Sequence, residues 1–174
     1  MTLLANIIGI AAVAMFVFSY QLKTRRTLIF FNAGSRVLYV LQYILLGAFE
    51  GLVLDATAFL VSLLAQYKDR GWLKKHIKLV IVGSNIFIVA MGLICYQNIF
   101  SLLPILGVLF ETGALWPSSE RHIRWLSLLG APFWLAYNLL FAAYGSAAGN
   151  VLTIVSIGIA IVRYDILKKS PNNQ

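Results

Sequence analysis

The chain has 174 residues, of which 60% are hydrophobic and 11% charged, and its mean hydropathy is +0.84. Because soluble domains carry about 25% charged residues, this composition excludes an ordinary water-soluble globule. Together with a net charge of +8, it predicts an all-α integral membrane protein.

Seven apolar runs are close to the length that a helix needs to cross a hydrocarbon core, about 17 to 25 residues. They cover residues 3–20, 28–46, 52–66, 79–96, 99–116, 125–143 and 148–164. The first run lacks the basic region and cleavage site of a secretory signal, so we expect a retained span. The third run is short, and we expect it to begin nearer Ala48.

The fourth and fifth runs are separated only by Tyr96, Gln97 and Asn98. One helix over residues 79–116 would be far longer than a bilayer requires, so we expect two spans there. Six spans would also place Arg121 and Arg124 on the opposite side from the other loop cations. The charge pattern therefore favours seven spans.

With seven spans, every basic residue except Arg36 falls on one side of the membrane. These residues are Lys23, Arg25, Arg26, Lys68, Arg70, Lys74, Lys75, Lys78, Arg121, Arg124, Arg163, Lys168 and Lys169. The opposite loops, 47–51, 96–98 and 144–149, contain no Lys or Arg. By the positive-inside rule the N-terminus is expected outside and the C-terminus in the cytoplasm. The positive charge is thus a topological signal, and nucleic-acid binding is not expected.

The loop lengths predict a 3+1+3 plan. Residues 1–66 form a first triple-helix bundle, 67–98 a basic loop and linker helix, 99–167 a second triple-helix bundle, and 168–174 a cytoplasmic tail. An odd linker helix gives both bundles the same orientation, as in parallel repeats related by an axis along the membrane normal. When the first half of the chain is aligned with the second at an offset of 95 residues, Asp55 aligns with Asn150 and Tyr39 with Trp134.

Three charged residues, Arg36, Asp55 and Glu111, lie within the apolar spans. Each costs about 2.5 to 3.5 kcal/mol at membrane depth on insertion scales, so each is expected to face a partner, a cavity or a substrate path. The depths of Arg36 and Glu111 permit an ion pair between the halves, and Asp55 is also within reach of a long arginine. Three roles stay open: a pair that fixes packing, a gate, or proton coupling through Asp55.

Two polar-aromatic stripes recur at helical spacing. Arg36, Tyr39 and Tyr43 share a face of the second span, with Gln42 beside them, and Trp134, Tyr137 and Asn138 share one on the sixth. Such stripes are typical of a lined cavity. The alternatives are that the aromatic residues anchor the helices at the interface or pack, and that Asn138 and Asn150 only bond neighbouring helices.

Short motifs then point to a family: Leu102, Leu103, Pro104 and Gly107 opening the fifth span, Trp134 with Asn138, and Leu45, Leu46 and Gly47 leading to Asp55. With these residues the chain resembles the YgjV family of bacterial inner-membrane proteins, which in turn is similar to the SWEET, SemiSWEET and PQ-loop transporters. The resemblance implies the bacterial inner membrane as the location and a solute site between the two bundles.

Position by position, the resemblance assigns Tyr39 and Trp134 to an aromatic pair and Asp55 and Asn150 to a polar pair. The chain departs from the SWEET pattern in two places. Asp55 replaces an amide, which points away from a neutral sugar. The Pro-Gln signature is also broken, because Gln21 has no proline before it and Pro117 no glutamine after it.

No nucleophile elbow, phosphate-binding glycine loop or metal-ligand spacing occurs, so we expect neither an enzyme nor a cofactor or metal. The single cysteine, Cys95, cannot form an intrachain disulfide. The loop 67–78, with Trp72 among Lys68, Arg70, Lys74 and Lys75, is expected to contact anionic lipid headgroups.

Two functions are therefore carried forward. The first is a small-solute transporter, a facilitator or proton-coupled, with a site of Tyr39, Asp55, Trp134 and Asn150, joined by Tyr43 and Asn138, and with Arg36 and Glu111 as gate or supporting ion pair. The second is a non-transporting membrane scaffold or partner subunit, in which the same residues serve packing. A homo-oligomer is compatible with either.

Overall fold

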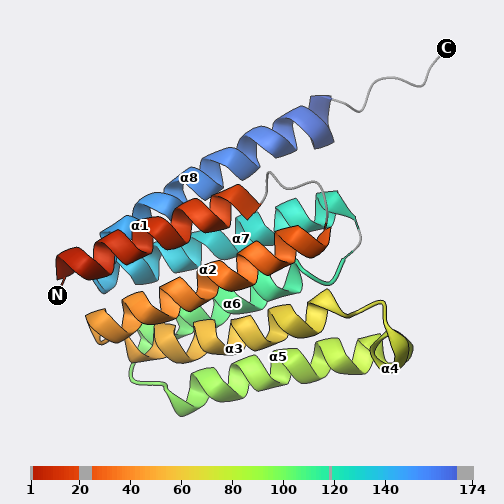
Figure 1. The fold of residues 1–174 in the computed structure, drawn as a ribbon, viewed down its shortest axis with the longest axis horizontal. Helices are drawn as coiled ribbons and strands as arrows, with labels where there is room; N and C mark the ends of the chain where they lie inside the picture. The colour runs from red at the N-terminus through yellow and green to blue at the C-terminus, as the bar shows by residue number, and fades with distance from the viewer. Residues whose placement is uncertain (1, 20–24, 118, 168–174) are drawn as a thin grey trace.

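The structure, a computed structural model, describes residues 2–19, 25–117 and 119–167, and this part of the chain is helical with short turns and no strand (Figure 1). Gln21, Lys23 and the tail 168–174 lie outside the described residues. The elements are α1 (Thr2–Ser19), α2 (Arg25–Leu46), α3 (Phe49–Gln66), α4 (Gly71–Lys75), α5 (Ile77–Ile94), η1 (Ile99–Ser101), α6 (Leu102–Gly113), α7 (Glu120–Leu140), α8 (Tyr144–Ile161) and η2 (Val162–Ile166).

The exterior of the helices is apolar, as expected for a protein that faces lipid. Large hydrophobic side chains are exposed along α5 in particular, including Leu79, Ile86 and Ile94. Among the described residues, four stretches are long and apolar enough to cross a membrane: 29–46, 49–66, 77–94 and 144–166. Shorter apolar helices cover 3–18 and 99–113. The chain is thus an α-helical membrane protein.

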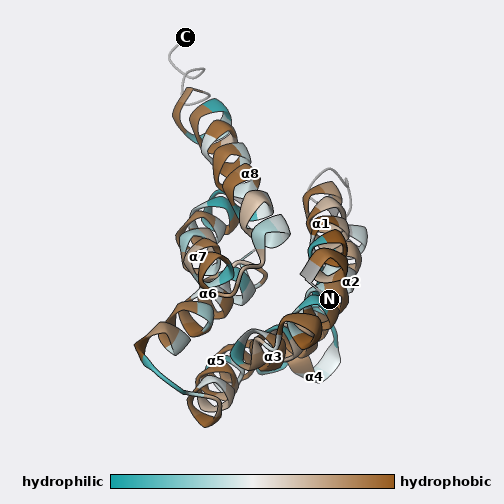
Figure 2. Ribbon diagram, turned by 90° about the vertical axis from the view of Figure 1, so that its left-hand side faces the viewer, coloured by the Kyte–Doolittle hydropathy of each residue, from teal (hydrophilic) through white to brown (hydrophobic). Residues whose placement is uncertain are grey.

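Helices α1, α2 and α3, called here the first helix group, lie beside α6, α7 and α8, called here the second (Figure 2). In the first group α2 packs between α1 and α3, and in the second α7 packs between α6 and α8. The groups meet along two seams, α1 with α8 and α3 with α6, while α5 packs against α3 and α6. The start of α1 and the end of η2 lie at opposite ends of the molecule (Figure 1).

Element bounds in the two groups agree with the offset of 95. Helix α3 covers 49–66 and α8 covers 144–161, which is the same range shifted by 95. Helix α2 begins at residue 25 and α7 at residue 120, again 95 apart. The turns that follow α2 and α7 both use a left-handed residue, Gly47 with φ +68° and Ala142 with φ +54°.

The division between the fourth and fifth spans falls where Asn98 caps η1. The Asn98 side chain accepts from the Phe100 N–H, and the Ser101 hydroxyl accepts from the Asn98 N–H. This reciprocal capping satisfies backbone donors that a helix start leaves free. The capping residue Asn98 marks the start of η1, and η1 leads directly into α6.

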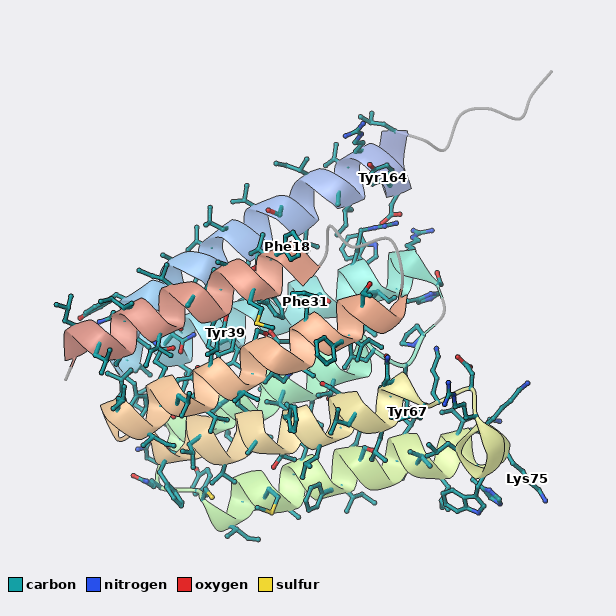
Figure 3. All side chains as sticks on the ribbon, in the orientation of Figure 1. Phe18, Phe31, Tyr39, Tyr67, Lys75 and Tyr164 are labelled. Carbon is teal, nitrogen blue, oxygen red and sulfur yellow. The ribbon has the colours of Figure 1, made fainter. Side chains whose placement is uncertain are left out.

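The basic loop differs from expectation in two respects. It contains a short helix, α4, in which His76 stacks on Trp72 with ring centroids 4.5 Å apart. Lys68, expected at the lipid headgroups, is instead buried, and its Nζ donates to the Trp116 carbonyl at 2.7 Å. The ammonium group thus binds the backbone three residues after the end of α6. By contrast, Lys75 points away from the helices (Figure 3).

Candidate functional site

Arg36 on α2 binds both of the other charged residues that lie in the spans. Its Nη1 donates to Asp55 Oδ1 on α3 at 2.7 Å, and its Nη2 donates to Glu111 Oε2 on α6 at 3.1 Å. The Arg36 and Asp55 side chains are each 3% exposed, and that of Glu111 is 15% exposed. The contact with Glu111 links the first helix group to the second. Sequence spacing allowed either pair; the structure contains both.

A second polar chain crosses between the groups. Tyr43 on α2 donates through its hydroxyl to Asn138 Oδ1 on α7, and the Asn138 amide donates to Asn150 Oδ1 on α8, each at 2.8 Å. Tyr43 and Asn138 are both buried. Tyr43 and Asn138 differ by 95 in number, so this bond joins equivalent positions of the two halves. The amides therefore do bond neighbouring helices, as the packing interpretation requires, and they do so beside the charged residues.

Three aromatic rings pack against one another beside these polar residues. The Tyr43 and Trp134 rings are stacked with centroids 6.1 Å apart, and Tyr137 meets each of them edge-on at 6.0 Å. The Trp134 indole packs against Gly107 of α6, where an added Cβ would lie 2.8 Å from Nε1. Gly107 thus leaves the space that the indole occupies, which explains a glycine at this motif position.

All eight residues singled out from the sequence line one cavity. Its lining comprises Arg36, Tyr39 and Tyr43 of α2, Asp55 of α3, Glu111 of α6, Trp134 and Asn138 of α7, Asn150 of α8, and Phe16 of α1. The cavity volume is about 20 Å³. That is room for about one water molecule, so the site is nearly closed. Both helix groups contribute charged and aromatic groups to it, and the two amides come from α7 and α8.

Hydrogen bonds also join the helix groups at the end of the molecule that carries the turns after α2 and α7. The Gly51 N–H donates to the Tyr137 hydroxyl at 2.8 Å, and the Ser146 hydroxyl donates to Gln42 Oε1 at 2.5 Å. Positions 42 and 137 are 95 apart, and so are positions 51 and 146. The two bonds therefore join equivalent positions of the two halves.

A second set of bonds repeats this relation. The Ser101 hydroxyl donates to Glu50 Oε1 at 3.1 Å, and the Gly145 N–H donates to Asn6 Oδ1 at 3.1 Å. Positions 6 and 101, and positions 50 and 145, are again 95 apart. We call the contacts between the helix groups made by Asn6, Gln42, Glu50, Gly51, Ser101, Tyr137, Gly145 and Ser146 the turn-end seal. It lies at the end of the molecule that carries the turns after α2 and α7.

Sequence reasoning missed some of these residues. Glu50 is only 2% exposed, but its place in a short glycine-flanked turn made it look like a loop residue. Phe16 looked like an ordinary residue of an apolar span, although the offset of 95 places it on Glu111. The ion pair of Arg124 with Asp165, with contacts at 2.5 and 3.1 Å, was also missed; neither residue lines the cavity.

Comparison with known proteins gives one match. A family model described as bacterial inner membrane protein, Imp-YgjV, matches residues 3–168. No curated protein and no solved structure matches the chain.

Proposed function

The chain belongs to the Imp-YgjV family of bacterial inner membrane proteins, and from this premise we propose that it moves a small solute across that membrane. The observation that carries the proposal is the cavity between the two helix groups, which both groups line with polar and aromatic side chains. Charged and amide groups at membrane depth are costly, and they commonly mark substrate paths. Sites between structural repeats at mid-membrane are typical of secondary transporters.

The proposal includes the seven-span, 3+1+3 arrangement and its SWEET-like character. Helices α1–α3 and α6–α8 would be the two parallel bundles and α5 the linker. Support comes from the packing order, from helix bounds that repeat at an offset of 95, and from the positions of the α1 start and the η2 end at opposite ends of the molecule. The proposed orientation, with the N-terminus outside and the C-terminus in the cytoplasm, is supported by the distribution of Lys and Arg. The turn-end seal is then the outer closure of the site.

We assign the residues as follows. Tyr39 and Trp134 form the aromatic walls, Asp55 and Asn150 contact the solute, and Tyr43 and Asn138 position them. The Arg36–Glu111 pair ties the bundles together on the remaining side and acts as a gate. Because the cavity has room for about one water molecule, a solute can enter only when the bundles separate. The described conformation corresponds to a nearly closed carrier.

Flux through proteoliposomes tests the proposal. The purified protein is expected to accelerate uptake of at least one member of a broad metabolite panel, and Asp55→Ala and Asn150→Ala are expected to abolish that uptake. Asp165→Ala is the matched control, since it removes a paired carboxylate that does not line the cavity. Size-exclusion elution and far-UV circular dichroism check the fold of each variant. Uptake at the wild-type rate in both cavity variants would refute the site assignment.

The second candidate function is a non-transporting scaffold or partner subunit. The observation that favours it is the small size of the cavity, because a packed interface needs no solute-sized space. In that case no solute of the panel moves, and cavity substitutions change stability alone. Neither candidate uses catalysis or a cofactor.

A further inference from the structure

The buried charges at the cavity do not balance. Arg36 supplies one positive charge, and it contacts two carboxyl groups, Asp55 and Glu111, on opposite sides of its guanidinium. With both acids ionised the cluster carries one net negative charge. An uncompensated charge at membrane depth is costly, so a proton or a cation must neutralise it.

Other groups around the two acids do not supply this positive charge. The titratable groups nearest to Asp55 and Glu111 are Arg36, Tyr39 and Tyr43 of α2 and Tyr137 of α7. The cavity residues from α1 and α8 are Phe16 and Asn150, which are uncharged. Glu50, which contacts Tyr137, adds a further acid toward the turn-end seal. Among the residues that the structure describes here, Arg36 is therefore the one cation.

The remaining walls of the cavity suit an organic cation that carries an oxygen. The aromatic residues Phe16, Tyr39, Tyr43 and Trp134 present rings that attract ammonium groups. One buried donor at the cavity, Arg36 Nε, has no hydrogen-bond partner in the described part of the chain. An unpaired buried donor is costly, and a ligand oxygen would satisfy it.

We propose that the solute is a small hydroxylated ammonium ion, an amino alcohol in its cationic form, and that it exchanges for a proton on the Asp55–Glu111 pair. This inference rests on the proposed transport function and names its substrate class.

The exchange balances in charge and in protons. In the empty carrier one carboxyl of the pair holds a proton, so the cluster with Arg36 is neutral. The ammonium ion enters, the carboxyl O–H bond breaks, and the proton leaves to water on the side from which the solute came. The ion is released on the other side, where a proton from water rebinds the carboxylate. One cation thus moves against one proton, with no net charge transferred.

Binding is tested first with the purified wild-type protein in detergent, using choline and its neutral isostere 3,3-dimethyl-1-butanol as probes. Choline is expected to bind at least tenfold more tightly than the isostere, and in weakly buffered solution to release up to one proton per choline bound. Its apparent Kd is expected to rise toward tenfold per unit as the pH falls through the range in which the pair takes up a proton, because proton and cation compete. Tetramethylammonium, which lacks the hydroxyl, is expected to bind more weakly than choline.

Replacing each acid by its amide then tests whether the Asp55 and Glu111 carboxyl groups supply the negative charge that binds choline. Glu111→Gln and Asp55→Asn each leave a neutral cluster, so each is expected to lower choline affinity at least tenfold and to remove the proton release. Asp165→Asn, outside the cavity, is the control and is expected to bind as the wild type does. If Asp55→Asn does not fold, the inference is still tested by Glu111→Gln, because the Glu111 side chain is partly exposed. It is also tested by the comparison of choline with its isostere in the wild-type protein. Equal binding of choline and isostere, or binding of neither, would overturn the inference.

Flux separates this inference from the proposed function. Proteoliposomes with a trapped pH dye are expected to show proton movement when choline or ethanolamine is added outside, and none with the isostere. If neutral solutes are carried and the cations are not, transport stands and the substrate class is wrong. If choline binds with proton release but no solute moves, the substrate class stands and transport is wrong.

Discussion

At the scale of single residues, Arg36 matters because it compensates two acids at once. Replacing it leaves Asp55 and Glu111 buried beside each other without a cation. Removing one partner of a buried pair costs about 3 to 5 kcal/mol, because the remaining charge stays out of water. Arg36→Gln is therefore expected to lower the free energy of unfolding by about that amount, or by less if both acids take up protons. Thermal unfolding in detergent measures this.

The control is the ion pair of Arg124 with Asp165, in which the Arg124 side chain is 19% exposed. Its loss through Asp165→Asn is expected to have a smaller effect, because a more exposed pair contributes less. The triple change Arg36→Gln, Asp55→Asn and Glu111→Gln removes the isolated charges and is expected to regain part of the stability. An Arg36→Gln protein as stable as Asp165→Asn would contradict the role given to the charge cluster.

The candidate site could be predicted in outline at this scale because ionisable and aromatic residues stand out in apolar spans. Arg36, Asp55 and Glu111 were found by their cost at membrane depth. Which acid Arg36 binds could not be predicted, because that depends on the rotation of α2 relative to α3 and α6. Glu50 and Lys68 escaped prediction because residues near a turn are expected to meet water, whereas the contact between the helix groups buries both.

At the scale of elements, the close seam between α1 and α8 depends on glycines four residues apart. A Cβ at Gly145 would lie 2.8 Å from the Asn6 carbonyl oxygen of α1, and a Cβ at Gly149 would collide with Val13. Small residues at this spacing let two membrane helices approach closely. Gly158, on the same helix, has nothing within 4 Å of an added Cβ.

These two glycines make a matched pair for a test. Gly149→Ala is expected to destabilise the protein by about 1 to 3 kcal/mol, because the methyl group forces α8 away from α1. Gly158→Ala is expected to be neutral or to stabilise by up to about 1 kcal/mol, since alanine favours the helix. The melting temperatures in one detergent give the comparison. Equal effects of the two substitutions would show that α8 does not pack on α1 through this face.

Helix bounds were predictable because they follow from apolar length and from turn residues. The predicted break at 96–98 corresponds to the capped start of η1, and the third helix begins at Phe49, near the expected Ala48. The short helix α4 was not predicted, because its five residues are too few to show a periodic pattern. The short π-type element η2 after α8 was missed for the same reason.

At the scale of the whole molecule, the two halves are joined by hydrogen bonds at equivalent positions, but different residue types make these bonds in each half. Gln42 with Ser146 is repeated by Tyr137 with Gly51, and Asn6 with Gly145 by Ser101 with Glu50. Since different residue types fill equivalent positions, residue identity between the halves is low even though the helix bounds coincide. The offset of 95 could be predicted from the order of spans, whereas the bonds needed three-dimensional coordinates.

The orientation proposed from the distribution of Lys and Arg gives the last prediction. If seven helices cross, Gln97 before η1 and Asp69 before α4 lie on opposite sides, outside and in the cytoplasm respectively. In a Cys95→Ser background, a cysteine at position 97 is expected to react with a membrane-impermeant maleimide in intact spheroplasts. A cysteine at position 69 is expected to react only after permeabilisation, because α5 separates the two positions.

Both positions are exposed in the fold, so access to them is limited by the membrane and not by burial. The cysteine at 95 must be removed because it lies two residues from the reporter at 97. Reaction of both reporters in intact spheroplasts would show that α5 does not cross and would reject the linker role. Reaction of position 69 alone would show that the protein has the opposite orientation in the membrane. The turn-end seal would then lie on the cytoplasmic side of the cavity instead of the outer side.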